Sequence, residues 1–248
     1  MSVNWGYVWV LLVCIGTVFS LIIGIKENRW LIENSSMVLG WLLLLMQSAY
    51  VKIEAVYWFV QKTKYTIYNP DTVWDMTIRY KTNSLDEKAI MKAQQEVCKT
   101  AVLDRPELRR LSNQRLEIRS DELFVELYVN WDEGLFQVFF NKLPVSFRGS
   151  QRVLNDRIIP IIEAIEKSLV IESKQYWLSV YFGNINPFYG LYMRRMKQNR
   201  ITEFNIRAKL GDREELIISR DKVEISAGSL SQLANEGRKY LTLSKIPA

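Results

Sequence analysis

The sequence predicts a membrane α-helical hairpin of two N-terminal transmembrane helices, followed by a cytoplasmic α+β domain with a mostly antiparallel sheet. Three observations lead to this fold class. Residues 7–25 form an apolar run without a charged side chain, and Met37–Val51 forms a second apolar run. Beyond residue 62, short runs of β-forming residues alternate with amphipathic segments and turn signals, which is typical of an α+β domain.

The two apolar runs match the requirements of a bilayer unequally. A hydrocarbon core about 30 Å thick needs about twenty apolar residues of helix, and the run at 7–25 meets that length. The second predicted span, 36–60, begins at Ser36 as a helix cap and ends in aromatic residues suited to a membrane interface, which are Tyr57, Trp58 and Phe59. An alternative for this run is one true span followed by an amphipathic helix on the membrane surface.

These spans set the expected domain organisation. Residues 1–61 form the hairpin, 62–82 the linker and first strand, and 73–248 the cytoplasmic domain. Basic side chains are concentrated after Val60, beginning with Lys62 and Lys64, so the positive-inside bias favours a cytoplasmic C-terminal part. The expected location is the bacterial inner (cell) membrane, multi-pass, with both termini in the cytoplasm.

The elements of the second part follow from local patterns. Alternating residues predict a strand at 73–82, and a helix is expected over 84–102. Pro106 begins a basic piece expected to be helical or irregular. Asp132–Gly134 joins two β-forming runs as a hairpin, and a helix over 150–170 is interrupted by Pro160. A strand at 176–184, a helix that starts at Asn186 and Pro187, three short strands over 202–227 and a final helix over 229–241 complete the expected order.

Small and polar residues recur in both apolar runs. Four-residue spacing of small side chains allows close helix packing, and amide or ionisable groups at membrane depth face a bundle interior or water. We therefore expect oligomerisation, and a pore in the oligomer. The expected packing or pore residues are Gly16, Thr17, Ser20, Gly24, Gly40, Gln47, Lys52 and Glu54. In the alternative, Lys52 and Glu54 lie at the headgroup boundary and Gln47 forms a hydrogen bond within a plain anchor.

A second constellation combines a helix start, aromatic side chains and basic side chains. Backbone amides at a helix start favour anions, aromatic faces stack on bases, and arginine pairs with phosphate. The expected ligand-binding residues are Asn186, Tyr189, Tyr192, Arg194, Arg195, Lys197 and Arg200. Side chains on neighbouring strands that could complete a basic site are Trp74, Arg79, Lys81 and Arg207. The alternative is an ordinary amphipathic helix whose apolar residues belong to the core.

Several common chemistries have no support in the sequence. The chain has no histidine, which removes the commonest general base and metal ligand, and it has neither GxxxxGK[ST] nor GxGxxG. Glu163 and Glu166 could share a helix face, although such pairs are usually solvated. We expect no cofactor and no metal, and an enzyme is disfavoured.

The layout of two N-terminal spans at 7–25 and 36–60 before one basic domain of net charge +6 for the chain resembles the membrane effectors of bacterial antiphage systems. These include the CBASS, CRISPR-linked and related nucleotidyltransferase-linked systems. The resemblance implies a soluble domain that binds a signalling nucleotide or oligonucleotide, and membrane segments that oligomerise to permeabilise the inner membrane.

The expected function is therefore an oligomeric inner-membrane effector or ion channel gated by a cytoplasmic domain that binds an anionic ligand, with membrane disruption in antiphage defence as the outcome. The expected partners are membrane lipid, further copies of the chain, a nucleotide or oligonucleotide ligand, and a partner protein of the same system. The alternative is a membrane-anchored scaffold or assembly subunit that binds another protein, and an anchored enzyme ranks third.

Overall fold

The computed structural model describes residues 15–16, 35–83, 85–100, 102–120, 123–183, 186–193, 201, 203–212 and 214–241. The chain divides into two compact units. The first comprises Met1–Lys64 with Leu191–Gln198, and the second comprises Tyr65–Gly190 with Asn199–Ala248. Each unit is described by itself.

The predicted fold class, a hairpin of two transmembrane helices before an α+β domain, is wrong in its hairpin, and the structure is a mixed α and β fold built on a nine-stranded antiparallel sheet. Within the described ranges, no single helix is both long enough and apolar enough to cross a membrane. Among the described residues, the bent pair Leu39–Lys52 and Glu54–Tyr68 has the length and composition of such a segment. The first predicted span, 7–25, lies outside the described residues except for Ile15 and Gly16.

The second predicted span, 36–60, is two helices rather than one. Helix α3 (Ser35–Lys52) and helix α4 (Glu54–Tyr68) are bent by 101° at Ile53. The carboxylate of Glu54 lies in the first turn of α4, where it interacts favourably with the positive end of the helix dipole. It also accepts a hydrogen bond from Trp58 Nε1 at 3.4 Å. A charged residue that suits a helix start therefore lies where a continuous span would need an apolar residue.

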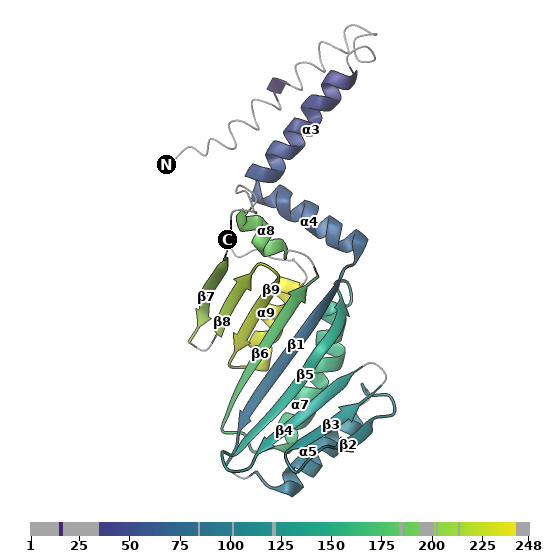
Figure 1. The fold of residues 1–248 in the computed structure, drawn as a ribbon, viewed down its shortest axis with the longest axis vertical. Coiled ribbons are helices and arrows are strands. Elements are labelled where there is room, and N and C mark those ends of the chain that lie inside the picture. The colour runs from purple at the N-terminus through teal and green to yellow at the C-terminus, as the bar shows by residue number, and fades with distance from the viewer. Residues whose placement is uncertain are drawn as a thin grey trace. The chain divides into compact units, whose positions relative to one another are not determined.

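One sheet forms the second unit, and all of its neighbouring strands are antiparallel (Figure 1). The strand order is β2-β3-β4-β5-β1-β6-β9-β8-β7. The strands are β1 (Asp71–Lys81), β2 (Glu107–Arg110), β3 (Arg115–Arg119), β4 (Phe124–Asn130), β5 (Leu135–Ser146), β6 (Ser173–Phe182), β7 (Asn205–Gly211), β8 (Glu214–Ser219) and β9 (Lys222–Ala227).

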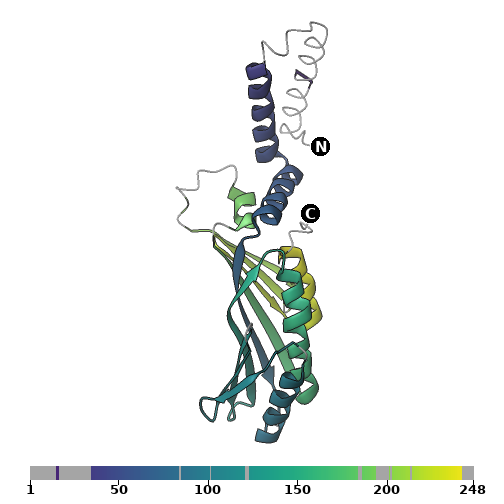
Figure 2. The same ribbon diagram turned by 90° about the vertical axis from the view of Figure 1, so that its right-hand side faces the viewer.

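Helices cover one face of this sheet, as Figure 2 shows. They are α5 (Glu87–Lys99), the continuous segment α6 (Ser150–Arg152), η1 (Val153–Ile158) and α7 (Ile159–Ser168), and α9 (Leu230–Leu241). Every second residue of β1 points into the core beneath them, and Trp74, Met76, Ile78 and Tyr80 are almost fully buried. This period of two is what a strand with one covered face requires.

The local signals explain most element boundaries. The Asp86 side chain caps α5 by accepting a hydrogen bond from Ala89 N at 2.7 Å, and Ser229 Oγ accepts from Gln232 N at 3.2 Å at the start of α9. Pro160 is accommodated because the preceding turn is a π-helix, which changes the backbone hydrogen-bond pattern ahead of it.

The predicted helical or irregular piece after Pro106 is wrong, because residues 107–119 form strands β2 and β3. Ser112 makes the turn between them, its Oγ accepting hydrogen bonds from the backbone N–H groups of Gln114 and Arg115, each at 3.1 Å. Ile118 is fully buried on β3, so tertiary burial supports the strand where the local pattern favoured a helix.

Candidate functional site

The sheet face opposite the helices carries polar, charged and aromatic side chains. On β1, the residues between the buried ones are Val73, Asp75, Thr77, Arg79 and Lys81, and all are half-buried or exposed. The registers of β5 and β6 place side chains of the same face beside them. We call this surface, formed by the strand residues that point away from α5, α7 and α9, the open face.

A pocket of about 520 Å³ lies on the open face. It brings together residues of six strands, β1, β5, β6, β7, β8 and β9. Its lining residues are Arg79, Lys81, Leu135, Ser173, Lys174, Gln175, Lys209, Gly211, Asp212, Glu214, Glu215 and Ser226. This volume lies in the range of about 300–1,000 Å³ that small-molecule sites usually have.

Arg79 is held in position beside this pocket by two neighbours. Its guanidinium carbon lies 5.2 Å from the centre of the Trp177 ring, a cation–π contact. With the Gln137 amide turned so that its oxygen faces the guanidinium, that oxygen accepts hydrogen bonds from Arg79 Nε at 2.8 Å and Nη2 at 3.3 Å. These contacts leave the other N–H groups of Arg79 for a further acceptor, because guanidinium carries five donors.

Most other cations of the open face already have a carboxylate partner. The ion pairs are Arg115–Glu126 at 2.6 Å, Arg119–Glu117 at 3.0 Å, Arg207–Glu215 at 3.0 Å and Lys222–Glu224 at 3.0 Å. The hydrogen bond to Glu224 raises the pKa of Lys222 above its usual value. Among the described residues, Arg79, Lys81 and Lys209 form no ion pair, so the pocket contains three cations without a described carboxylate partner.

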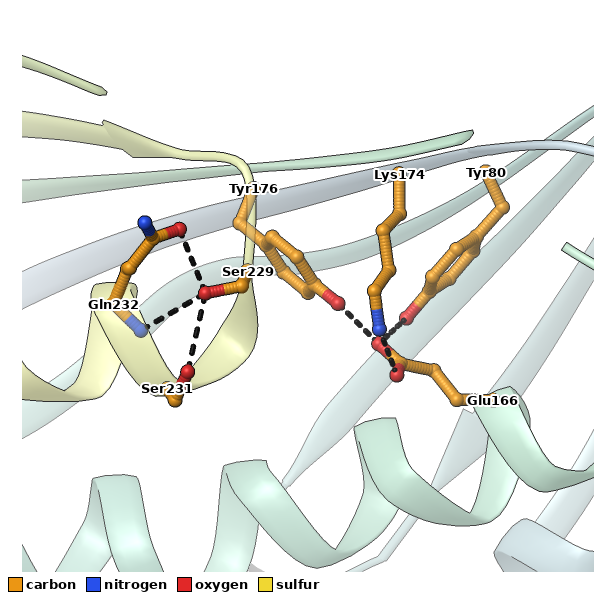
Figure 3. A network of polar contacts seen from close by, with 7 residues as sticks. All are labelled: Tyr80, Glu166, Lys174, Tyr176, Ser229, Ser231 and Gln232. Carbon is orange, nitrogen blue, oxygen red and sulfur yellow. Dashed lines mark hydrogen bonds and ion pairs between the residues drawn. The ribbon is translucent and has the colours of Figure 1, made fainter. Parts of the chain in front are cut away.

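A second polar cluster lies on the helix side of the sheet (Figure 3). The carboxylate of Glu166, on α7, accepts hydrogen bonds from the hydroxyls of Tyr80 at 3.3 Å and of Tyr176, and Lys174 Nζ lies 2.6 Å from its other oxygen. Burial first, and the Glu166 carboxylate in addition, raise the pKa of both tyrosines. The phenols therefore stay neutral at pH 7, and the cluster joins α7 to β1 and β6.

The two glutamates considered for catalysis do not converge on one site. Glu163 lines a smaller pocket of about 280 Å³ that residues of α5 and α7 form, whereas Glu166 belongs to the cluster under the sheet. Across the part of the chain that the structure describes, no group of three His, Cys, Asp or Glu residues could hold a metal ion.

The predicted ligand residues near helix α8 (Pro187–Met193) differ in burial, and some of them lie outside the described residues. Asn186 is fully buried, its Oδ1 accepts from Tyr189 N at 2.7 Å, and its Nδ2 donates to the carbonyls of Lys222, at 3.2 Å, and Ser219. These contacts are the helix cap expected from the sequence. Tyr189 is buried and Tyr192 is 49% exposed. The four basic residues of this prediction, Arg194, Arg195, Lys197 and Arg200, lie outside the described residues, so their role in ligand binding stays a prediction.

The strand residues proposed to complete a basic site divide between the two faces. Arg79 and Lys81 do line one pocket, whereas Trp74 is buried on the helix side and Arg207 is paired with Glu215. The sequence did not single out Gln137, Trp177 or Lys209. The alternating residues around Trp177 indicate a strand. Its pairing with neighbouring strands was needed to decide on which face of the sheet the Trp177 side chain lies.

The predicted packing or pore residues are described only in part. Thr17, Ser20 and Gly24 lie outside the described residues, and a Cβ added at Gly16 or Gly40 would meet open space. Their packing role stays a prediction.

Three of the predicted packing or pore residues, Gly40, Gln47 and Glu54, do not lie along one helix. The bend at Ile53 places Gly40 and Gln47 on α3 and Glu54 on α4. Gln47 is exposed on α3 and Lys52 is half-buried at the end of that helix.

The sequence matches no protein-family model, and a search of the curated proteins found no match.

Proposed function

We propose that this protein is an oligomeric effector or ion channel of the bacterial inner membrane, controlled by an anionic ligand that binds the sheet unit. The ligand is a nucleotide or oligonucleotide, and membrane disruption in antiphage defence is the outcome. The observation that carries the proposal is the pocket on the open face, where Arg79, Lys81 and Lys209 have no described ion-pair partner. Unpaired cations in a concave site attract phosphate.

The position of Arg79 supports phosphate recognition over a merely solvated charge. A surface arginine loses side-chain entropy when it binds a ligand, and this cost weakens binding. Stacking on Trp177 and the bonds to Gln137 fix the guanidinium before any ligand arrives. The entropic cost of binding is therefore reduced, as expected for a preorganised site.

The exposed apolar surface of α3 supports the membrane part of the proposal. Leu39, Leu43, Leu44 and Met46 are each between 58% and 64% exposed. Each such side chain would gain about 1.5–3 kcal/mol if it were removed from water, so lipid or further copies of the chain would cover this helix favourably. In this proposal the sheet unit lies in the cytoplasm, where the ligand and a partner protein of the same system would be found.

The ligand can control the membrane segment only if it binds two arrangements of the protein with different affinity. The test therefore measures binding and release together. The full chain is reconstituted in dye-loaded liposomes and titrated with mononucleotides, cyclic dinucleotides and short oligonucleotides. Arg79→Gln is compared with Arg119→Gln, a control on the same face whose ion-pair partner Glu117 does not line the pocket.

We expect one of these ligands to change the dye release of the wild type. The same ligand should bind Arg79→Gln with an affinity lower by about tenfold or more, because charge-assisted hydrogen bonds are lost. Arg119→Gln should bind as the wild type does. Unchanged affinity in Arg79→Gln would contradict the pocket assignment, and intact liposomes under every condition would contradict the effector or channel function.

A membrane-anchored scaffold is the second candidate, and the edge strand β2 favours it. All four residues of β2 are exposed, and Leu108 is 52% exposed. An uncovered edge can add a strand from another protein. A stable protein partner together with unchanged liposomes would favour this function.

A further inference from the structure

The pocket on the open face holds opposite charges at separate places. Arg79 and Lys81 lie on β1, whereas Asp212, Glu214 and Glu215 belong to the β7–β8 hairpin. Among the described residues, neither cation forms an ion pair with these carboxylates. A purely anionic ligand would be attracted by one group and repelled by the other, so the pocket suits a ligand with an anionic end and a hydrogen-bond-donating end.

The hairpin is shaped so that the Glu214 carboxylate stays available, in addition to the exposed Asp212. The register of β7 and β8 shifts between Lys209 and Gly211, as a β-bulge does when it redirects a side chain. A Cβ on Gly211 would lie 3.2–3.4 Å from the carboxyl atoms of Glu214, so glycine leaves room for that group. Glu215 is already paired with Arg207 at 3.0 Å, whereas Glu214 has no ion pair with a described residue.

We infer that the ligand is a ribonucleotide of one or two nucleotides, with its phosphate at Arg79 and Lys81 and its nucleoside hydrogen-bond donors at Glu214. This deepens the proposed function and rests on it. Carboxylates recognise ribose hydroxyls in dinucleotide-binding sites, and amino groups of a base supply the same chemistry. The volume of about 520 Å³ accommodates a ligand of this size.

Isothermal titration of the full chain in detergent tests the inference. The probes are AMP, GMP, the dinucleotide pApA, the 2′-deoxy form of each, and inorganic tripolyphosphate. The variants are Arg79→Gln, Glu214→Gln and the control Glu133→Gln, an exposed glutamate of the β4–β5 turn outside the pocket.

The expected signature is an effect of opposite sign in Glu214→Gln. Ribonucleotides should bind about tenfold more weakly because a charge-assisted hydrogen bond is lost, whereas tripolyphosphate should bind more tightly because a repulsive charge is removed. If the 2′-deoxy probes bind the wild type with the same loss of affinity, the ribose hydroxyl is the donor to Glu214. If Glu214→Gln loses affinity only for AMP or only for GMP, the donor is on the base. Glu133→Gln should match the wild type.

Two results would overturn the inference while the anionic-ligand pocket stands. In the first, Glu214→Gln binds every nucleotide as tightly as the wild type does, or more tightly. In the second, the wild-type protein binds tripolyphosphate but binds none of the nucleotides. If the wild type binds no probe at all, or if Arg79→Gln leaves every affinity unchanged, the proposed function of the pocket fails as well.

Discussion

Replacement of Tyr176 by phenylalanine should destabilise the sheet unit by about 1.5–3 kcal/mol, the usual value of a hydrogen bond to a charged group. Tyr176 is fully buried, and its hydroxyl donates to the Glu166 carboxylate. The substitution keeps the ring and removes only the donor. Lys174 and Tyr80 continue to bind the carboxylate, so no charge is left without partners.

The cluster geometry also ranks three related substitutions. Tyr80→Phe should cost less, about 0.5–1.5 kcal/mol, because its bond to Glu166 is longer, at 3.3 Å. Glu166→Leu should cost most, because it leaves two buried hydroxyls without their acceptor, each at about 1–3 kcal/mol. Tyr128→Phe, on the open face, is the control and should change stability by less than about 0.5 kcal/mol.

Urea unfolding of the full-length variants at pH 7, followed by tryptophan fluorescence, measures these free energies. The double variant Tyr80→Phe with Tyr176→Phe should not be additive, because both hydroxyls share one acceptor oxygen. Equal effects for Tyr176→Phe and Tyr128→Phe, or a Glu166→Leu protein as stable as the wild type, would refute the role given to this cluster.

Three further outcomes follow from features elsewhere in the sheet unit and from its titration. Gly134→Ala should lose more than about 1 kcal/mol in thermal or urea unfolding, because φ is +59° and a Cβ would lie 2.4 Å from a backbone carbonyl oxygen, whereas Gly183→Ala meets open space and serves as its control. Asn186→Ala should lower the melting temperature measured by circular dichroism, since it removes a cap of about 1 kcal/mol and leaves two carbonyls without their donor. The pKa of Tyr80 and of Tyr176 is raised in the folded state, so stability should hold below pH of about 10 and fall above it, by up to about 1.4 kcal/mol per pH unit for each phenol. Urea titrations across that range should show a shallower fall in the double phenylalanine variant.

Local sequence signals were sufficient where one residue type determines the backbone. Gly134 adopts a positive φ that glycine tolerates, and the β4–β5 hairpin lies where Asp132–Gly134 predicted it. Asn186 caps the helix that it was expected to begin, and Asp86 caps α5 within the stretch 84–102 where a helix was expected. In each case the interaction spans three residues or fewer, so it can be recognised from the sequence alone.

Long-range pairing determined what the sequence could not show. The basic side chains of residues 107–119 favoured a helix or an irregular segment, yet Ile118 pairs opposite Val125 and is buried there. Arg79 and Lys81 were recognised as basic candidates, but Lys209 reaches the same pocket from β7, an edge strand separated from β1 by three other strands. A shift of one residue in any strand would move its side chains to the opposite face, so the pocket depends on register.

Strand β1 follows α4 after two residues and occupies an interior position, hydrogen-bonded to β5 along one side and to β6 along the other. Tension applied to the N-terminal segment along β1 would therefore act on both ladders of hydrogen bonds at the same time, in shear. An edge strand under the same pull would be held by one such ladder instead of two. The chain thus attaches its N-terminal segment to an interior strand held on both sides, and the same strand carries Arg79 and Lys81, so tension on that segment would act on a strand that lines the pocket.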